Sequence, residues 1–326
     1  MMGNNFAPTA SMRIATDECA QLNELSRLND WEADYLQFGT GKFHATFNLY
    51  ASTGIRITDQ YCNREMVISA SPPPKHTALF LPLNPGHKGI LQGKSLGAGD
   101  AALIGPESET FYRSPGDLRM MVVTIPVSRL KQAIEAATDD KSHQLSAETR
   151  VFTLTDDTLS RLAKNMNCAL EIAETTADQA EVNVCLQEIE QDIVTTLSLA
   201  LTNPEPPEKG AQGRRNRLGY VKRARRFIEA NLSSPLGLET LSQVAGASQR
   251  TLEIAFREIF NITVVQYIRN RRLIAINRLL LHPQYTETSV SKLARTYGFN
   301  HMGRFALNYR ALFGESPSDT LPKQKG

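Results

Sequence analysis

Six side chains near the start of a predicted helix carry groups that suit contact with nucleic acid. Counted from Ser248, the outward-facing residues of this helix are Gln249, Arg250, Thr251, Glu253, Ile254 and Arg257. An arginine can donate two hydrogen bonds to guanine, and a glutamate can accept one from cytosine. This chemistry is useful only if the rest of the fold lets the helix enter a groove of DNA.

The segment that contains this helix occurs twice. The first copy contains Leu238, Leu241, Gly246, Ser248, Leu252 and Phe256, and the second contains Val290, Leu293, Gly298, His301, Phe305 and Tyr309. In each copy a short helix ends at a glycine, which can adopt the left-handed conformation of a tight turn. A second helix follows a capping position, filled by Ser248 in the first copy and by His301 or Asn300 in the second. One such match fits any buried helix pair, but two in tandem predict two helix-turn-helix units.

The second copy is poorer in polar groups. Its matching outward residues are Met302, Gly303, Arg304, Ala306, Leu307 and Arg310. We therefore expect this unit to add mostly phosphate and shape contacts. Residues 264–281, between the copies, predict one unbroken helix about 27 Å long. Such a spacer could hold both units near one DNA turn apart, so that both reading helices enter successive major grooves.

Charge and composition divide the chain in two. Residues 213–326 hold 19 Lys and Arg against 7 Asp and Glu, a net charge of +12, whereas the remainder holds 17 against 27, a net charge of −10. A basic domain beside an acidic one indicates nucleic-acid binding, although a basic surface without a partner would look the same. Prolines and glycines make residues 203–213 a linker. We expect one domain at residues 1–202 and the DNA-binding domain at residues 214–326.

Residues from about Tyr220 to Leu321 resemble the DNA-binding domain of the AraC/XylS family of transcription regulators. The resemblance is carried by Leu252-x-x-x-Phe256-Arg257, Tyr267-Ile268, Arg272-Leu273, Ala275, Leu293-Ala294, Gly298-Phe299, Phe305, Arg310 and Phe313-Gly314-Glu315-Ser316-Pro317. It covers about a third of the chain. It implies an all-α domain that binds double-stranded DNA and works with RNA polymerase, most often as an activator. It also implies that Arg250, Glu253 and Ile254 touch base edges.

Two groups of DNA contacts follow from these positions. We expect base reading by Arg250, Thr251, Glu253, Ile254, Met302, Gly303, Arg304 and Leu307. We expect phosphate contacts from Gln249, Arg257, Arg271, Lys292 and Arg310. Arg272 is either a phosphate contact or a structural ion-pair partner. The basic run from Arg214 to Arg226 either contacts the DNA backbone or forms a solvated helix face.

The N-terminal half has the pattern of a sheet domain. Short β-prone runs separated by turn clusters at about residues 35–126 predict a sandwich or a barrel. The turns at Gly99-Asp100 and Gly105-Pro106 resemble those of a jelly roll. We therefore expect an α+β protein whose N-terminal part is a cupin-like β-barrel with a helical hairpin. An effector pocket could be lined by Phe43, His44, His76, His87, Phe80, Phe111 and Tyr112, although each is alternatively a surface or core residue.

Residues 127–202 carry two apolar stripes at helical spacing. The first stripe is Leu159, Leu162, Met166, Ala169 and Leu170, and the second is Val182, Leu186, Ile189, Ile193, Leu197 and Leu201. They predict two helices joined at about residues 175–178. The stripes either cover the barrel or form a dimer interface. We favour a homodimer, which Leu186→Asp or Ile193→Asp would then break.

Other chemistry has no motif in this sequence. The four cysteines and six histidines are widely spaced, so we expect no metal and no cofactor. We find no nucleophile elbow, P-loop or dinucleotide fingerprint. No run approaches the roughly 20 apolar residues of a membrane span, and no signal segment begins the chain, so we expect a cytoplasmic protein that does not bind membranes.

Three functions fit these observations. The first is a ligand-responsive regulator, not an enzyme. The resemblance to the XylS branch offers an organic acid as one candidate for its small-molecule effector, and the sequence of the sheet region leaves that choice open. The second is an enzyme that the C-terminal module brings to DNA, and the missing metal triad argues against it. The third is a ligand-independent DNA binder or a repressor.

Overall fold

Two antiparallel β-sheets form the N-terminal half of the computed structural model, which describes residues 9–84, 86, 88–97, 99–138, 145, 148–174, 179–202, 211–282, 284–285 and 287–322. The strands are β1 Thr9–Thr16, β2 Glu32–Gln37, β3 Ala45–Ser52, β4 Arg56–Cys62, β5 Met66–Ser71, β6 His76–Pro82, β7 Lys88–Leu91, β8 Lys94–Gly97, β9 Asp100–Ile104, β10 Thr110–Ser114, β11 Leu118–Pro126 and β12 Arg150–Thr153. The larger sheet has the order β1-β3-β4-β11-β6-β9-β12, and the smaller has the order β2-β5-β10-β7-β8.

The two sheets pack face to face around an apolar core. Phe47 and Phe80 of the larger sheet lie in one buried cluster with Ile68 and Tyr112 of the smaller sheet. Within the described strands each ladder stays inside its own sheet, so the domain is an open sandwich, one of the two predicted architectures, and the predicted barrel is not closed. The sheet region also begins earlier than the predicted residue 35, because β1 pairs along its whole length with the distant strand β3.

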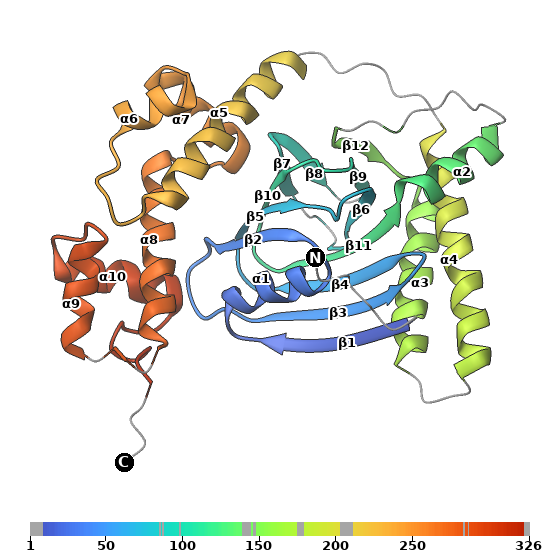
Figure 1. Ribbon diagram of the computed structural model, residues 1–326, viewed down its shortest axis with the longest axis horizontal. Coiled ribbons are helices and arrows are strands. Elements are labelled where there is room, and N and C mark those ends of the chain that lie inside the picture. The colour runs from blue at the N-terminus through green and yellow to red at the C-terminus, as the bar shows by residue number, and fades with distance from the viewer. Residues whose placement is uncertain are drawn as a thin grey trace.

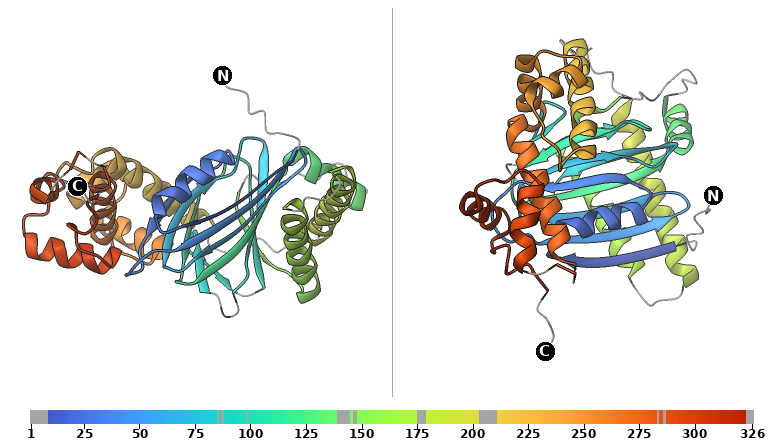
Figure 2. Two further views of the ribbon diagram at one scale, coloured as in Figure 1. Left: turned by 90° about the horizontal axis from the view of Figure 1, so that it is seen from below. Right: turned by 60° about the vertical axis from the view of Figure 1, so that its left-hand side comes forward.

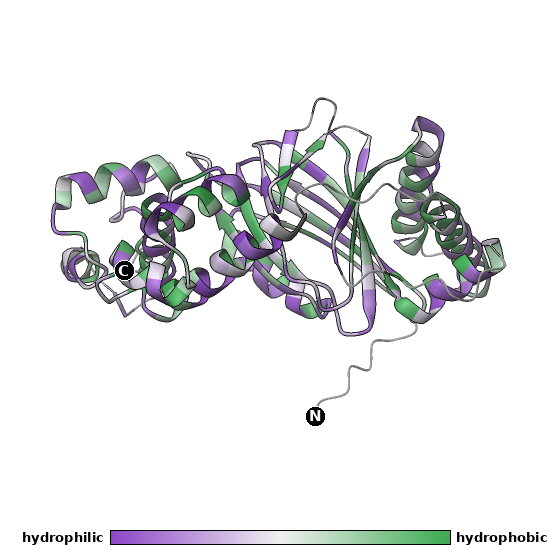
Figure 3. Ribbon diagram, turned by 90° about the horizontal axis from the view of Figure 1, so that it is seen from above, coloured by the Kyte–Doolittle hydropathy of each residue, from purple (hydrophilic) through white to green (hydrophobic). Residues whose placement is uncertain are grey.

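Helix α1, Cys19–Leu28, covers one opening of the sandwich and contacts β2. Its residues Leu22 and Leu25 are buried in the same core cluster as the inner faces of the two sheets. Green and purple bands alternate along the strands in Figure 3, as expected where one face of a sheet is buried and the other is not. The helix therefore closes one end of the sandwich core.

Three helices lie on the outer face of the larger sheet: α2 Val127–Thr138, α3 Asp156–Ala173 and α4 Gln179–Leu201 (Figures 1 and 2). Both predicted helices of the hairpin are present, and the joint predicted at residues 175–178 lies outside the described residues. The apolar stripe of α4 faces inward, and Leu186 is only 2% exposed. It packs in one cluster with Met166 of α3 and Val123 of β11. The stripe therefore covers the sheet, and the predicted use of Leu186 and Ile193 as a dimer surface is wrong.

The C-terminal half is entirely helical over its described residues. It consists of α5 Ala211–Ala230, α6 Leu238–Ala245, α7 Gln249–Phe260, α8 Val264–Leu280, α9 Glu287–Thr296 and α10 Met302–Phe313. Helix α8 is unbroken over 17 residues, and a capping box between Thr263 and Gln266 fixes its start. It is about 26 Å long at 1.5 Å per residue, so the unbroken helix predicted between the two units is present.

The molecule is elongated, with the sandwich in the middle (Figures 1 and 2). The C-terminal helices lie against the smaller sheet, and α3 and α4 lie at the opposite end. Among the described helices, none is both long enough and apolar enough to cross a membrane.

Candidate nucleic-acid interface and effector cavity

Helix α7 presents the predicted reading residues to solvent. The turn before it is closed by Gly246 at φ 66°, and the Ser248 hydroxyl accepts a 3.1 Å hydrogen bond from the Thr251 amide. The opposite face of the helix, which includes Leu252 and Phe256, is fully buried. Gln249, Arg250, Ile254 and Arg257 are exposed, and Thr251 and Glu253 are half-buried. The packing of one face thus fixes which side chains the other face offers to a ligand.

Helix α10 repeats this arrangement in the second unit. It starts at the N-cap His301, whose side chain makes no capping hydrogen bond, and Gly298 before it has φ 81°. Gly303, Arg304 and Leu307 are exposed and Met302 is half-buried. Leu307 occupies the position that Ile254 occupies in α7, and the two side chains are 72% and 47% exposed. Large apolar side chains at matching exposed positions suit contact with thymine methyl groups.

The predicted phosphate contacts fall into two groups. Gln249 and Arg257 of α7, Lys292 of α9 and Arg310 of α10 are exposed. Arg271 is 9% exposed, and its guanidinium donates a 2.7 Å hydrogen bond to Asp34 and a second one to Glu229. In this arrangement Arg271 is a structural ion-pair residue and cannot reach a phosphate, which corrects its assignment.

Arg272 is also structural. Its Nε donates to the Leu232 carbonyl at 2.9 Å and its Nη2 donates to the Ser234 carbonyl at 2.7 Å. Burial lowers the pKa of this guanidinium. The sequence left open whether Arg272 contacts phosphate or forms a structural ion pair. It does have a structural role, but its partners are backbone carbonyls and not an acidic side chain.

The basic run of α5 faces the protein more than the solvent. Arg217 pairs with Glu258 of α7, and Arg223 donates to the Ala245 carbonyl at the end of α6. Lys222 and Arg225 both pair with Glu109, a residue of the N-terminal half. Much of this run therefore serves to join helices and domains, a role that differs from both sequence-based alternatives.

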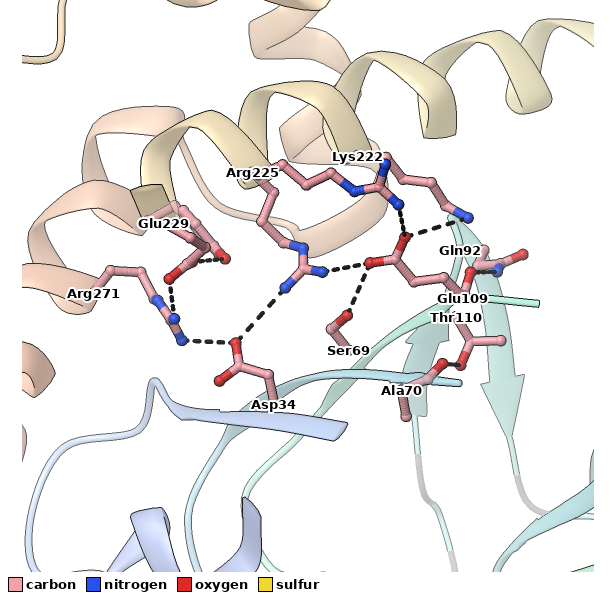
Figure 4. A network of polar contacts seen from close by, with 12 residues as sticks. Asp34, Ser69, Ala70, Gln92, Glu109, Thr110, Lys222, Arg225, Glu229 and Arg271 are labelled. Carbon is pink, nitrogen blue, oxygen red and sulfur yellow. Dashed lines mark hydrogen bonds and ion pairs between the residues drawn. The ribbon is translucent and has the colours of Figure 1, made fainter. Parts of the chain in front are cut away.

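A network of charged side chains connects the two halves of the chain (Figure 4). Asp34 of β2 accepts from Arg271 of α8 at 2.7 Å and lies 3.7 Å from Arg225 of α5. Glu109, next to β10, pairs with Arg225, and its Oε2 lies 3.6 Å from the Lys222 amine. These side chains are at most about a third exposed, so water screens them less than surface pairs.

Apolar packing lies beside this network. Phe111 of β10 is fully buried and meets Phe260 of α7 edge to face, with ring centroids 5.3 Å apart. The Arg225 guanidinium lies 5.4 Å from the centre of the Phe111 ring. Leu36 of β2 and Val67 of β5 belong to the same buried cluster as the helices of the first helix-turn-helix unit. Sheet and helices thus share one continuous core.

The second helix-turn-helix unit also contacts the sheet domain, at the end of α10. The Gly41 amide donates to the Ala311 carbonyl at 2.9 Å, and the Gln37 side chain donates to the Leu312 carbonyl at 2.7 Å. Gly314 has φ 75°, and a Cβ there would come within 2.9 Å of the Lys42 amide. The close approach thus depends on glycine at this position.

A cavity lies between the two sheets and beneath α1. Its free volume is about 60 Å³. Its lining residues are Ser26, Asn29, Trp31, Ala33, Tyr35, Phe47, Thr58, Gln60, Ile68, Ala70, Phe80, Leu91, Ile104, Thr110, Tyr112, Met120 and Val122. Burial raises the pKa of both Tyr35 and Tyr112, so both phenols stay neutral at physiological pH.

Of the predicted pocket residues, Phe80 and Tyr112 line this cavity, and His87 lies outside the described residues. Phe43 and His44 line a separate groove between the sheet domain and the end of α8. His76 bonds to the Pro74 carbonyl at the start of β6 and is outside the cavity lining, while Phe111 points the other way, into α7. Sequence reasoning chose aromatic and histidine side chains without knowing which strand face was internal, and it missed Asn29, Tyr35 and Gln60.

Three strands place the cavity and the domain interface on opposite faces. Tyr35 of β2 lines the cavity, while its neighbours Asp34 and Leu36 contact the C-terminal helices. On β5, Ile68 lines the cavity and Val67 packs outward. On β10, Thr110 and Tyr112 line the cavity on either side of the outward-facing Phe111. Because successive side chains alternate across a strand, a single sheet separates the two sites.

Comparisons with known proteins identify several that are similar to this chain. Residues 241–323 match a family model described as a helix-turn-helix domain. The XylDLEGF operon transcriptional activator 3 of Pseudomonas putida is 45% identical over 104 residues, 32% of this chain and 31% of that protein. The XylDLEGF operon transcriptional activator 2 of Pseudomonas putida is 40% identical over 116 residues, 34% of this chain and 74% of that protein.

The matched stretch is therefore about a third of the length of the first of these activators. Among solved structures, the AraC-like transcriptional activator CuxR aligns with a TM-score of 0.43 at 18% sequence identity, covering 81% of this chain and 94% of that one.

Proposed function

Because the chain belongs to the AraC/XylS family of transcription regulators, we propose that it is a ligand-responsive activator that binds double-stranded DNA and RNA polymerase in the cytoplasm. The observation that carries this proposal is the position of the cavity. Its walls on β2, β5 and β10 are the same strands whose outer faces hold the C-terminal helices. The sandwich, on this view an open relative of a cupin-like jelly roll, senses a small molecule and does not catalyse a reaction.

Ligand binding in the cavity can affect the C-terminal helices because only one layer of sheet separates the two. A ligand that fills the cavity must displace side chains such as Tyr35 and Tyr112, because protein interiors are closely packed. Those residues share a backbone with Asp34 and Phe111, which hold α8 and α7. The ligand thereby changes the free energy of domain docking, and docking in turn sets the arrangement of the two reading helices.

The test of DNA binding needs no known operator. The full chain is incubated with a pool of random duplexes, and bound sequences are enriched and then measured by gel shift. We expect enrichment of one motif with two half-sites about one DNA turn, roughly 34 Å, apart. A chain that enriches no motif would contradict the proposal. Enrichment that no small molecule changes would favour the alternative of a ligand-independent binder.

Arg250→Ala tests base reading directly. We expect loss of preference at one position of the motif and specific binding weaker by about 1–3 kcal/mol, because a bidentate contact to guanine is lost. Binding to random DNA should change little. Arg13→Ala is a matched control, since it removes the same charge from an exposed side chain on β1. Equal losses on specific and random DNA would show that Arg250 only contacts phosphate.

We also propose that the protein is a homodimer that uses the exposed face of α4. Val184 and Leu199 are 58% and 55% exposed and lie about four helical turns apart on this face. The double substitution Val184→Asp and Leu199→Asp should raise the dimer dissociation constant at least about tenfold, since two charges enter the interface. Analytical ultracentrifugation measures this. Leu28→Asp, at a 56% exposed leucine of α1, is the control, and an unchanged dissociation constant for the double variant would refute this interface.

A further inference from the structure

The cavity between the sheets has a lining that limits the charge of any ligand. Of the described residues that line it, none is Asp, Glu, Lys, Arg or His. A carboxylate moved from water into such a site loses its hydration and gains no cation in return, which costs far more than burial of a neutral group. The lining therefore disfavours the organic acid that family resemblance suggested.

One polar group in the cavity lacks a partner. Asn29, which follows the last turn of α1, is 2% exposed, and its side-chain oxygen Oδ1 is buried without a hydrogen bond. The other polar residues of the lining include several that already have partners. The Tyr35 hydroxyl donates to Gln60 at 3.0 Å, and Trp31 Nε1 donates to Thr124 at 3.3 Å. A buried acceptor without a partner is costly, so a ligand that donates to it recovers free energy.

The size of the cavity sets a further limit. A single water needs about 10–15 Å³ of such space. The free volume of about 60 Å³ is several times this but less than half of the roughly 150 Å³ of a cavity that holds benzene, so the ligand is no larger than one six-membered ring and must displace lining side chains to enter. Phe47, Phe80 and Tyr112 supply apolar walls for such a ring.

We infer that this cavity binds a small neutral ligand with one apolar ring and one hydrogen-bond donor, and that the donor bonds to Asn29. This inference rests on the proposed sensory role of the same cavity. It names the chemical class of the effector: phenols and ring alcohols belong to this class, whereas benzoate-like acids and plain hydrocarbons do not.

Three probes, each built on one six-membered aromatic ring, separate these classes on the full-length chain. Phenol carries the donor, toluene replaces the donor with a methyl group, and benzoate carries a charge. Trp31 is the only tryptophan and lines the cavity, so its fluorescence reports binding without a label, and calorimetry supplies an independent readout. We expect saturable binding of phenol, roughly two- to tenfold tighter than toluene, because one hydrogen bond is gained. We expect benzoate to bind at least about tenfold more weakly than phenol.

Asn29→Leu should remove the preference for phenol over toluene. Asn48→Leu is the matched control, because Asn48 follows Phe47 on β3, points away from the cavity and bonds to Asp59 on the neighbouring strand. It should keep the preference of the unaltered chain. If Asn29→Leu does not fold, the comparison of the three probes on the unaltered chain still decides the inference.

Benzoate binding as tight as phenol, equal affinity for phenol and toluene, or no saturable binding of phenol would each overturn the inference. These measurements contain no DNA, so they are separate from the test of the proposed function. An acid that alters DNA binding while phenol fails to bind would overturn the ligand class and leave the regulator intact. Phenol selectivity without any effect on DNA binding would support the ligand class and remove the proposed coupling.

Discussion

Phe111→Ala is expected to release the C-terminal helices from the sheet domain while both halves stay folded. Phe111 is fully buried between β10 and α7, in contact with Phe260 and beneath Arg225. Truncation of a buried phenylalanine costs about 3–5 kcal/mol, and here much of that loss falls on the packing between the domains. Solution X-ray scattering should show a larger radius of gyration, and calorimetry should show two thermal transitions.

The matched control for this variant is Phe47→Ala. Phe47 is a buried phenylalanine of the larger sheet that lines the cavity and belongs to the core of the sandwich alone. Its truncation should lower the stability of the sheet domain and leave the radius of gyration of the folded protein unchanged. If Phe111→Ala keeps the scattering profile and a single transition, the ion pairs and the contacts at α10 suffice for docking. The proposed coupling through β10 would then be wrong.

Leu186→Asp is expected to unfold the sheet domain, which differs from the dissociation that the helical stripe alone predicted. Leu186 is packed among residues of α3 and the larger sheet. A charge at this position loses its hydration without a partner, so the free energy of unfolding should fall by more than about 4 kcal/mol. Loss of strand signal in far-ultraviolet circular dichroism at lower temperature checks this.

Leu28→Asp is the control for this prediction, because it makes the same substitution at a leucine of α1 that is 56% exposed and lies outside the proposed dimer face. Surface substitutions usually change stability by no more than about 0.5 kcal/mol, so its melting curve should match that of the unaltered chain. A folded but monomeric Leu186→Asp variant would restore the stripe as a dimer surface. A variant with normal stability would show that Leu186 is not buried between α4, α3 and the larger sheet.

Much of the C-terminal half could be predicted because its signals are local. The glycines at 246 and 298 and the uninterrupted run after Thr263 set the turns and the spacer helix through nearest neighbours in the chain. The alternation of buried and exposed residues on α7 follows from the 3.6-residue period, so the outward positions could be counted from Ser248. The role of each outward side chain on DNA stays a prediction.

The N-terminal half could be predicted only in outline, because its signals are not local. Period-two patterns indicated strands, but they could not show that β1 pairs with β3 or that the strands split into two sheets. The charge difference between the two halves also could not be interpreted fully from the sequence, because it depends on contacts between distant residues. Part of the basic excess pairs with Asp34 and Glu109 of the acidic half, so it attaches the two domains to each other and is not free for DNA.

By itself, then, the sequence determined the tandem helix-turn-helix units, the rigid helix between them and the residues that face outward from each reading helix, since all of these depend on contacts within a few turns of backbone. Tertiary structure alone decided that Phe111 and Arg271 belong to a domain interface, that the α4 stripe is internal, and that Asn29 faces a cavity. The physical reason is that strand pairing and domain docking join residues far apart in the chain, and the pattern around one residue does not reveal its distant partner.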